Sequence, residues 1–526
     1  MKSVESLLGE NVGTAIYCES DQVYCHIYDE FKDRIRVGMF LLIKSSFQQK
    51  NIAILAQVVS IQKFEDIYQL RRAKESLATL KPRELYKLVI IGIFVDNQFL
   101  RIIVQPNLGD KVYTIKDSAE IMNISKHKNE IYINFGKLYG YKNILIPLKL
   151  KEFFNHCAIT GVTGSGKSYT IKQLIMKFSQ VRINNTKIAI PIVVVDAHGD
   201  YYDLYDAFRK GKIKHNFGDV IRLVFRNSKA WFDDPRSLSI LIDFNSLNPQ
   251  DMAIMASDLA NLRRENLETF LAVQDFFRIF YQNYKNVNYY LEDKNRFDTV
   301  IENISKQLKN SNYSKIAINI MQRVVRQFGD IVRQNYLVAS KPGSRQIVIN
   351  RNFIEEIIRK KKFVIFDFSI NGALHASSLA KRIIISCFLA FLFEVFVNYK
   401  ITKQNGNLIF ILEDAHDYIP NVKRYKIIAN LLREKMKLIA KSKGLGVGFI
   451  LVTHTLSYVD PTIIEHVGSL IIHKVSIEDL IFLRNLIKTI PKDLASQLLQ
   501  LEKGTAMILG RIVFISAPVL VSISNT

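Results

Sequence analysis

Cysteine is scarce in this sequence, and the residues present lie far apart. No pair has the Cys-x-x-Cys spacing of a zinc ribbon, and no set has the spacing of a disulfide framework. The sequence therefore gives no support to a cysteine-held metal site or to a disulfide-stabilised fold, and a reducing interior suits it best. The cysteines are Cys18, Cys25, Cys157 and Cys387.

Long apolar runs and a leader segment are also missing. The most apolar stretch, residues 383–397, is shorter than the ~20 residues that a spanning helix needs, and it contains Glu394. We interpret it as a buried helix. The N-terminus does not have the basic and then apolar order of a signal peptide. The sequence thus predicts a cytoplasmic protein that does not enter a membrane.

Glycine and proline are few, with 23 and 11 residues in a chain of 526. This composition excludes extensive low-complexity disorder, and the length allows two to four domains. Basic residues are abundant: 72 Lys and Arg against 49 Asp and Glu give a net charge of +23. Such a surplus favours a polyanionic partner, although a proteome rich in lysine would produce the same surface, and no run of five basic residues marks a tail.

Residues 161–168 read GVTGSGKS and match the phosphate-binding pattern G-x-x-x-x-G-K-[ST]. In this pattern backbone N–H groups hold phosphate oxygens, Lys167 reaches the β- and γ-phosphates, and Ser168 is a Mg²⁺ ligand. An exposed Gly/Ser loop is the alternative. The predicted cofactors are ATP and Mg²⁺, and the predicted nucleotide-binding residues are Gly161, Val162, Thr163, Gly164, Ser165, Gly166, Lys167, Ser168 and Tyr169.

Acidic residues follow two apolar runs that we expect to be strands. Residues 408–412 are followed by Glu413 and Asp414, and residues 192–195 are followed by Asp196. Hydrolysis by a phosphate-loop ATPase needs one carboxylate to hold Mg²⁺ through water and one to polarise the attacking water. The alternatives are a surface turn carrying two acids and, for Asp196, a helix cap.

A third run ends in Thr453 and His454, after the glycines of residues 444–448. A polar side chain at this place would sense the γ-phosphate by hydrogen bonding, since polar groups at strand ends face the ligand crevice of such sheets. The glycines could equally be turn residues. His454 is therefore a candidate catalytic residue.

The distribution of apolar residues predicts three kinds of structure. Short β-rich runs in residues 13–62 indicate a small N-terminal β-barrel. Unbroken apolar strands that alternate with helices indicate an α/β domain with a mostly parallel sheet. We expect a barrel at 1–110, a linker at 111–150, an ATPase domain at 151–510 with a helical insertion at about 205–345, and a C-terminal strand or tail at 511–526.

The expected insertion has a helical apolar period. Core packing is the usual role of such a stripe. Its basic residues could line a nucleic-acid path or be solvated helix faces. The stripe is formed by Leu267, Phe270, Val273, Phe277 and Phe280, and the basic residues include Arg263, Arg264, Arg323, Arg326 and Arg333.

The order of these pieces resembles the HerA branch of the HerA–FtsK superfamily of DNA-translocating ATPases. After the barrel come GVTGSGKS, DAHGDYYD, ILEDAHDYIP, GLGVGFILVTH and LEKGTAMILGRI, so the resemblance covers nearly the whole chain. It implies a RecA-like motor domain behind a barrel of the kind found in rotary ATP synthase subunits. It also implies a hexameric ring around duplex DNA and a NurA-type nuclease partner in DNA end resection.

The resemblance also assigns roles to single residues. It implies that Lys167 and Ser168 bind nucleotide and Mg²⁺. Glu413 corresponds to the first acid of the second motif and a metal ligand, and Asp414 to the catalytic acid. Asp196 corresponds to the acid of the family's D-x-H-G-E-Y loop. Two residues depart from the family pattern: Asp414 stands where Glu is usual, and His454 stands where Gln is usual.

The arginine finger of the family has no direct counterpart. A finger is an arginine that one subunit inserts into its neighbour's site, and it contributes ~10³-fold or more in rate. The nearest residue to its place here is Lys443, with Lys441 close by, and the family's arginine before the phosphate loop aligns with Asn155. Lysine lacks the bidentate fork of arginine. The other candidates are Arg433 and Arg511, and Arg511 is also a predicted nucleotide-binding residue.

The resulting hypothesis is an ATP-driven DNA translocase or helicase that works as a ring. One alternative is a conjugation- or secretion-type ATPase of the same superfamily. Another, motivated by the missing arginines, is a DNA-binding scaffold that depends on nucleotide and hydrolyses ATP weakly or not at all.

Overall fold

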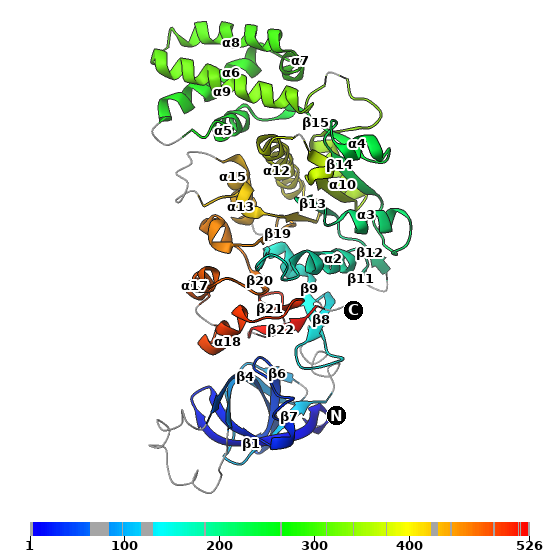
Figure 1. The fold of residues 1–526 in the computed structure, drawn as a ribbon, viewed down its shortest axis with the longest axis vertical. Coiled ribbons are helices and arrows are strands. Elements are labelled where there is room, and N and C mark those ends of the chain that lie inside the picture. Colours follow the sequence, from blue (N-terminus) through cyan, green and yellow to red (C-terminus); the bar gives the residue numbers. More distant parts are fainter. Residues whose placement is uncertain are drawn as a thin grey trace. The chain divides into compact units, whose positions relative to one another are not determined.

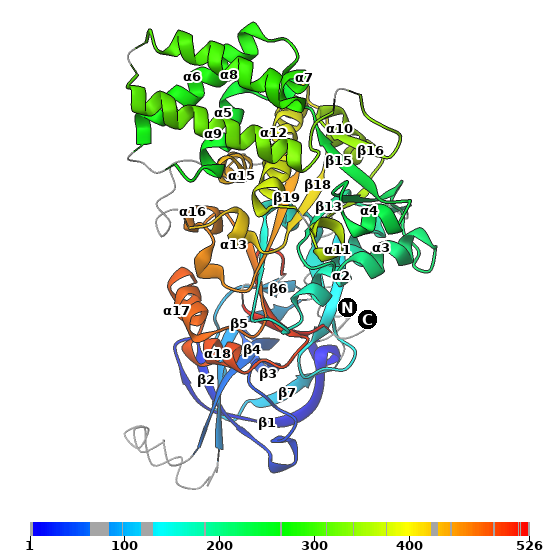
Figure 2. The ribbon, with the colours of Figure 1, turned by 45° about the horizontal axis from the view of Figure 1, so that its top comes forward.

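The computed structural model divides the chain into two compact units, which are interleaved in the sequence. One contains residues 1–152, 159–177 and 468–526, and the other contains 153–158 and 178–467. Figures 1 and 2 show their elements. The structure describes residues 4–63, 84–96, 98–116, 130–183, 186–262, 266–311, 313–339, 341–374, 376–421, 430–441, 444–487, 490–513, 515 and 517–523.

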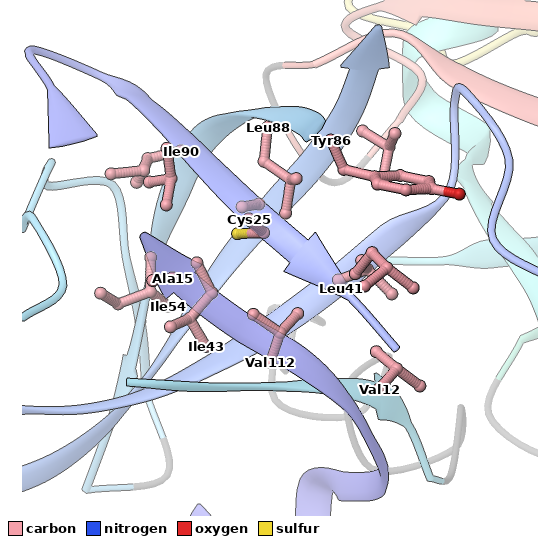
Figure 3. Close-up of a cluster of buried hydrophobic side chains, with 14 of the residues drawn as sticks. Val12, Ala15, Cys25, Leu41, Ile43, Ile54, Tyr86, Leu88, Ile90 and Val112 are labelled. Carbon is pink, nitrogen blue, oxygen red and sulfur yellow. The ribbon is translucent and has the colours of Figure 1, made fainter. Parts of the chain in front are cut away.

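The N-terminal part of the first unit is a closed six-stranded β-barrel. The strand order is β2-β1-β7-β3-β4-β5, and pairing of β2 with β5 closes it, while β6 extends β5. Alternate side chains fill the interior, which Figure 3 shows packed with aliphatic residues and Tyr86. The strands are β1 (Leu8–Glu19), β2 (Gln22–Ile27), β3 (Phe40–Phe47), β4 (Lys50–Lys63), β5 (Glu84–Val95), β6 (Gln98–Leu100) and β7 (Lys111–Ile115).

The same unit contains an antiparallel set of strands in the order β20-β21-β22-β8-β9. Strands β7, β8 and β9 fall within residues 111–150, the range expected to be a linker. β7 pairs with β1 and β8 with β22, both far away in the sequence, and β9 pairs with β8. The strands are β8 (Tyr132–Leu138), β9 (Leu145–Lys149), β20 (Ser469–Ile472), β21 (Thr505–Gly510) and β22 (Val519–Ser522), with helices α2 (Lys167–Phe178), α17 (Ile477–Leu486) and α18 (Lys492–Ser496).

The second unit is built on a parallel sheet in the order β16-β15-β14-β17-β13-β18-β19. Every one of these pairings is parallel, and most of the strands are buried along their whole length. Near-continuous apolar strands of this kind need cover on both faces. The strands are β13 (Ile192–Asp196), β14 (Val220–Val224), β15 (Leu238–Ile242), β16 (Gln346–Ile349), β17 (Phe363–Asp367), β18 (Leu408–Leu412) and β19 (Val447–Thr453).

Helix α12 (Ser378–Ile401) packs on this sheet, with Phe388 stacked on Phe410 of β18 at a centroid distance of 5.7 Å. It contains the most apolar stretch of the sequence and is buried over most of its length, which confirms the interpretation as a core helix. In the part of the chain that the structure describes, no helix has the length and apolar character to span a bilayer. The other helices near the sheet are α3 (Tyr202–Arg209), α4 (Lys229–Asp233), α10 (Arg351–Arg359), α11 (Ile370–Ala373), α13 (Ala415–Tyr418), α15 (Leu431–Lys441) and α16 (Pro461–Ile464).

A helical insertion separates β15 from β16. Figures 1 and 2 show α6, α8 and α9 side by side. The insertion begins at Pro249 rather than near residue 205, because β14 and β15 belong to the sheet. Its helices are α5 (Pro249–Leu259), α6 (Leu267–Asn283), α7 (Val287–Glu292), α8 (Lys294–Leu308) and α9 (Lys315–Gln334). The barrel, the mostly parallel sheet and the insertion confirm the predicted fold class.

The apolar stripe of α6 differs at its N-terminal end from the predicted one. Leu267 is 56% exposed, whereas Val273, Phe277 and Phe280 are fully buried as expected. The buried face also includes Phe276, which crosses Phe277 in an edge-to-face contact. Of the basic residues named above, Arg326 pairs with Asp298 and Arg333 with Asp330, while Arg263 and Arg264 lie outside the described residues.

One buried polar side chain ties the barrel to the C-terminal segment of its unit. Gln57 of β4 is 1% exposed, and its Nε2 donates to the carbonyl oxygens of Gly38, at 3.2 Å, and Pro518, at 2.8 Å. We predict that Gln57→Ala destabilises this unit by about 1–3 kcal/mol, because one buried and one partly buried carbonyl lose their donor. Chemical denaturation followed by circular dichroism measures the change.

The matched control is Gln98→Ala, since Gln98 is exposed on β6. It should change stability by less than about 0.5 kcal/mol. Equal effects of the two substitutions would contradict the structural role given to Gln57.

Candidate functional site

The phosphate loop leaves the buried strand β10 (Cys157–Thr160) and ends in the first turn of α2. Gly161, Gly164 and Gly166 have φ values of +154°, +77° and +113°, which residues with a Cβ rarely adopt. A Cβ on Gly161 would also lie 2.7 Å from the Cβ of His473. The loop therefore needs glycine at these places, and it delivers the chain to a helix N-terminus, where first-turn N–H groups have no intrahelical acceptor.

The contacts of two side chains in this loop indicate that an anion binds here. The Nζ of Lys167 donates to the carbonyl oxygens of Gly161, at 2.7 Å, and Val162, at 3.1 Å, so the ammonium group lies over the loop. The Oγ of Ser165 is buried and has no hydrogen-bond partner. A buried hydroxyl without a partner is costly, and an oxygen of a bound phosphate would satisfy it. Ser168 and Tyr169 follow on α2, both partly buried.

A buried histidine holds the phosphate loop in place. His473, after β20, accepts from the Oγ1 of Thr170 through Nε2 at 2.9 Å and donates from Nδ1 to the carbonyl of Thr505 at 3.0 Å. Because a carbonyl only accepts, the proton of the neutral ring is on Nδ1. Burial lowers the pKa of His473 to about 4. The ring thus stays neutral at physiological pH and fixes the first turn of α2.

In the other unit, acidic residues lie at the carboxyl ends of neighbouring parallel strands. Asp196 ends β13, Asp367 ends β17 directly beside it, and Glu413 and Asp414 follow β18. Carboxyl ends of parallel strands meet at one edge of the sheet, where ligands of such folds bind. The structure therefore brings together the three predicted acids Asp196, Glu413 and Asp414.

Asp196 shapes the loop that follows it. Its Oδ1 accepts the N–H groups of His198, Gly199 and Asp200 at 3.3, 2.7 and 3.1 Å, and its Oδ2 accepts that of Tyr201 at 3.1 Å. Burial raises the pKa of Asp196 to about 6, although these hydrogen bonds act to lower it. These four hydrogen bonds hold the turn before α3. The N-cap residue of α3 is Tyr201, so Asp196 stabilises the turn and is not the helix cap named as the alternative above.

Glu413 is 3% exposed and is held by two donors. The hydroxyl of Tyr201 donates to Oε1 at 2.6 Å, and the N–H of Ala197 donates to Oε2 at 3.3 Å. Burial and, to a smaller extent, the nearby Asp196 raise the pKa of Glu413 to about 8. A nearby cation would lower this raised pKa and stabilise the ionised carboxylate. Glu413 is therefore a suitable outer ligand of a divalent cation.

Asp367 belongs to a structural ion pair. The Nε and Nη2 of the buried Arg222 donate to its Oδ2 at 2.9 and 2.5 Å, and the hydroxyl of Ser369 donates to Oδ1 at 2.5 Å. The guanidinium also lies over the ring of Tyr202, 4.3 Å from its centroid. This acid is fully engaged, and we assign it no catalytic part.

Asp414 is more accessible than Glu413, with 24% of its side chain exposed. Its backbone is left-handed, with φ of +46°, which turns the chain sharply from β18 into α13. The Nε2 of His198 lies 2.9 Å from Oδ2, and the Nδ1 of His454 lies 3.9 Å from Oδ1. The ring of His416 crosses that of His454 at a centroid distance of 4.4 Å. Asp414 is thus a partly solvated carboxylate among three imidazoles.

The candidate fingers differ in their contacts. Arg433 of α15 is held by the buried Asp460, with 2.8 Å between Nε and Oδ2. Arg511 follows β21 and is exposed. Lys443 lies outside the described residues, and Lys441 is the last residue of α15. An inserted finger must be accessible, so Arg511 fits this part better than Arg433.

Sequence reasoning missed several residues of these sites. Asp367 carries the signal used for the other acids, since it follows the apolar run 363–366. Tyr201 and His198 lie in a recognised motif but were assigned no role. His473 had no local signal, because its partner Thr170 is 303 positions away in the chain.

Comparisons with known proteins agree with this geometry. Residues 133–392 match the family model described as "Helicase HerA, central domain". The chain is 24% identical over 459 residues to the DNA double-strand break repair helicase HerA of Pyrococcus furiosus, covering 83% of this chain and 76% of the relative. It is 24% identical over 524 residues to the probable DNA double-strand break repair helicase HerA of Methanocaldococcus jannaschii, covering 95% and 93%.

Solved structures show the same fold. The bacterial conjugative coupling protein TrwBdeltaN70 matches with a TM-score of 0.50 and 13% identity, covering 78% of this chain and 92% of that one. A structure of TrwB with a non-hydrolysable GTP analogue, GDPNP, also matches with a TM-score of 0.50, at 12% identity, covering 78% and 93%. This chain therefore has the fold of these P-loop ATPases.

The buried His473 predicts a pH dependence of stability. Its pKa of about 4 in the folded protein is below the ordinary 6.5, so the unfolded chain binds the proton more readily. The contribution of His473 to the free energy of unfolding is complete above pH 6.5, and about 3 kcal/mol of it is lost as the pH falls towards 4. His473→Gln should make stability depend less on pH in this range. Denaturation midpoints measured between pH 7 and pH 4 test this.

The half-buried His215 offers the matched control. His215→Gln should leave the acid slope as in the wild type. If His473→Gln had the wild-type slope as well, the neutral anchoring role of His473 would be wrong.

Proposed function

The chain is a distant member of the HerA helicase family, and we propose that it is an ATP-driven DNA translocase or helicase. The observation that carries the proposal is the position of Glu413 and Asp414 at the end of a parallel strand in a chain that also has the glycine-rich phosphate loop. An acid that can act on water, together with a phosphate cradle, is what NTP hydrolysis requires.

The phosphate loop fits a nucleoside triphosphate by the chemistry of its donors. Lys167 and the first turn of α2 would bind the phosphates, and the orphaned Oγ of Ser165 would gain an acceptor. We propose that Ser168 and Glu413 hold Mg²⁺, the latter through water. Bound Mg²⁺ would neutralise charge on the phosphate oxygens. The predicted cofactors are thus ATP and Mg²⁺.

Within this proposal Asp414 orients the attacking water and accepts its proton. Its partial exposure gives water access, whereas the buried Glu413 is shielded. His198 and His454 flank the carboxylate and limit its rotation. His454 would sense the γ-phosphate by a hydrogen bond, and Asp196 keeps the neighbouring loop in shape through its backbone bonds.

The proposed partners follow from family membership and charge. The curated relatives are named DNA double-strand break repair helicases. The net charge of +23 supports binding to DNA through its phosphates. We propose duplex DNA as the substrate, a hexameric ring as the working form, and a NurA-type nuclease as a partner in end processing.

A scaffold that binds DNA and hydrolyses ATP weakly is the second candidate. The engagement of Arg433 with Asp460 favours it, because it removes one of the few candidate fingers. The two candidates differ in one measurement, the ATPase rate with and without linear duplex DNA. A motor is stimulated several-fold, and a scaffold is not. Particle mass measured on the same sample tests the ring, which a monomer at working concentration would exclude.

The roles of Lys167 and Asp414 predict different defects. Lys167→Ala should abolish ATP hydrolysis by removing the phosphate-binding ammonium. Asp414→Asn should retain ATP binding but stop turnover, because an amide cannot accept the proton of water. Binding of a fluorescent ATP analogue and phosphate release measure the two properties.

Asp233→Asn is the matched control for this pair, since Asp233 is exposed at the end of α4. It should hydrolyse ATP at the wild-type rate. Wild-type turnover by Asp414→Asn would refute the assignment of the water-polarising acid.

A finger at Arg511 predicts complementation between subunits. Arg511→Ala should lower the rate by ~10³-fold while ATP still binds. A mixture of Arg511→Ala and Asp414→Asn subunits should regain activity, because some sites then combine an intact Asp414 with a neighbour's intact Arg511. Phosphate release by mixed assemblies measures this.

Arg433→Ala is the comparison for this experiment. Loss of Arg433 leaves Asp460 buried without its cation, so we expect a loss of about 3–5 kcal/mol in stability. If Arg511→Ala hydrolysed ATP normally, or if the mixtures stayed inactive, Arg511 would not be the finger.

A further inference from the structure

Three side chains at the end of β18 and β19 can converge on one metal ion. Asp414, His416 and His454 each offer a ligand atom, and these atoms all lie within 4.8 Å of one another. Asp414 and His416 come from the turn into α13, and His454 follows β19, which pairs with β18 in parallel. Two imidazoles and one carboxylate are a common ligand set for borderline transition metals.

The ring of His416 is already oriented for ligation. Its Nδ1 lies 3.2 Å from the Oγ1 of the buried Thr453. That hydroxyl donates to the carbonyl of Thr455 at 3.1 Å, so it accepts from His416, and the proton is on Nδ1. Nε2 is therefore left with its lone pair, which a metal needs. A hydrogen bond from the other ring nitrogen is usual for ligating histidines.

The remaining groups around the cluster suit a cation. The Nε2 of His198 lies 2.9 Å from Oδ2 of Asp414, and Oδ1 of Asp417 lies 3.5 Å from Nε2 of His416. His198 can orient the carboxylate or add a fourth ligand. No Lys or Arg is within ion-pair distance of Asp414 among the described residues. Among the residues that the structure describes, the side chains recorded beside Asp414 as ion-pair partners are thus imidazoles.

The distances require a small closure. In a tetrahedral site with bonds of ~2.0–2.1 Å, ligand atoms are about 3.3 Å apart. The Nδ1 of His454 is 3.9 Å from Oδ1 of Asp414, and 44% of the His454 side chain is exposed. The three ligand atoms lie within 4.8 Å of one another, so they must move closer together, and the exposed ring of His454 has room to rotate. The rings of His416 and His454 are already in edge-to-face contact.

We propose that Asp414, His416 and His454 form a binding site for a Zn²⁺-like transition-metal ion, separate from the Mg²⁺ that accompanies ATP. Imidazole nitrogen favours Zn²⁺, Co²⁺ or Ni²⁺ over Mg²⁺, which prefers oxygen ligands and an octahedral shell. A bound ion occupies the carboxylate of Asp414 and so stops ATP hydrolysis. Binding stands on the geometry alone, whereas this inhibition rests on the proposed function.

Titration of the metal-free full-length protein with Co²⁺ tests the site. One equivalent should produce the visible absorption of a four- or five-coordinate ion, and Zn²⁺ should displace it. His454→Gln, which removes a ligand, should weaken binding at least as much as the ~10–100-fold that loss of an outer-shell partner costs. His215→Gln is the matched control and should bind as the wild type does.

Two outcomes overturn the site. One is a purely octahedral, weak Co²⁺ spectrum in the wild-type protein. The other is equal affinity of the wild type, His454→Gln and His215→Gln, which would place the ion elsewhere.

The inhibition is measured separately as phosphate release in excess Mg²⁺. Added Zn²⁺ should lower the wild-type rate at least 10-fold, and a chelator should restore it. The His454→Gln rate, compared with its own zinc-free value, should fall only at correspondingly higher Zn²⁺. Undiminished turnover in the zinc-saturated wild type would overturn the inhibition. A protein that never hydrolyses ATP but binds Co²⁺ as expected would refute the proposed function and leave the metal site standing.

Discussion

The burial of two carboxyl groups side by side, those of Asp196 and Glu413, is the constraint on which the acidic site depends. Burial raises both pKa values, to about 6 and about 8, since a buried charge loses its hydration. The donors that offset this cost all come from residues 197–201. The conformation of that loop therefore follows from the acids. Gly199, with φ of +86°, supplies the turn that brings these N–H groups to Asp196.

The same loop links chemistry to packing. Tyr201 is fully buried, so its hydroxyl is fixed on Glu413 by the core rather than by a mobile side chain. Helix α3 begins at the next residue, and its Tyr202 lies over the guanidinium of Arg222, which pairs with Asp367. One continuous polar network thus runs through the ends of β13, β14, β17 and β18. Asp414 meets this network at His198, whose Nε2 lies 2.9 Å from Oδ2. It is nevertheless 24% exposed, so one acid is accessible to water while its neighbour Glu413 is enclosed.

Much of this could be predicted from the sequence, because the decisive signals are local. A run of buried strand residues followed by acids needs no knowledge of distant contacts, and glycine spacing alone defines the phosphate loop. Other features depend on pairs far apart in the chain. Gln57 bonds to Pro518, 461 positions away, and β7 lies between β1 and β3 in the barrel although its segment was expected to be a linker. Periodicity carries no information on such pairings, so the barrel order and the histidine anchor could only be found in the structure.

Asp414 and His454 are most informative when considered together. By the resemblance described above, each departs from the family pattern: one acid is a methylene shorter, and an imidazole stands where an amide is usual. A shorter carboxylate is drawn back towards its strand, where His198 already lies 2.9 Å from it. The replacing imidazole lies on the other side, against His416. An amide there would form hydrogen bonds and is a weak ligand for borderline transition metals, whereas an imidazole is a good one. In the proposed metal site these two residues therefore make the chemistry around Asp414 depend on which cation is present.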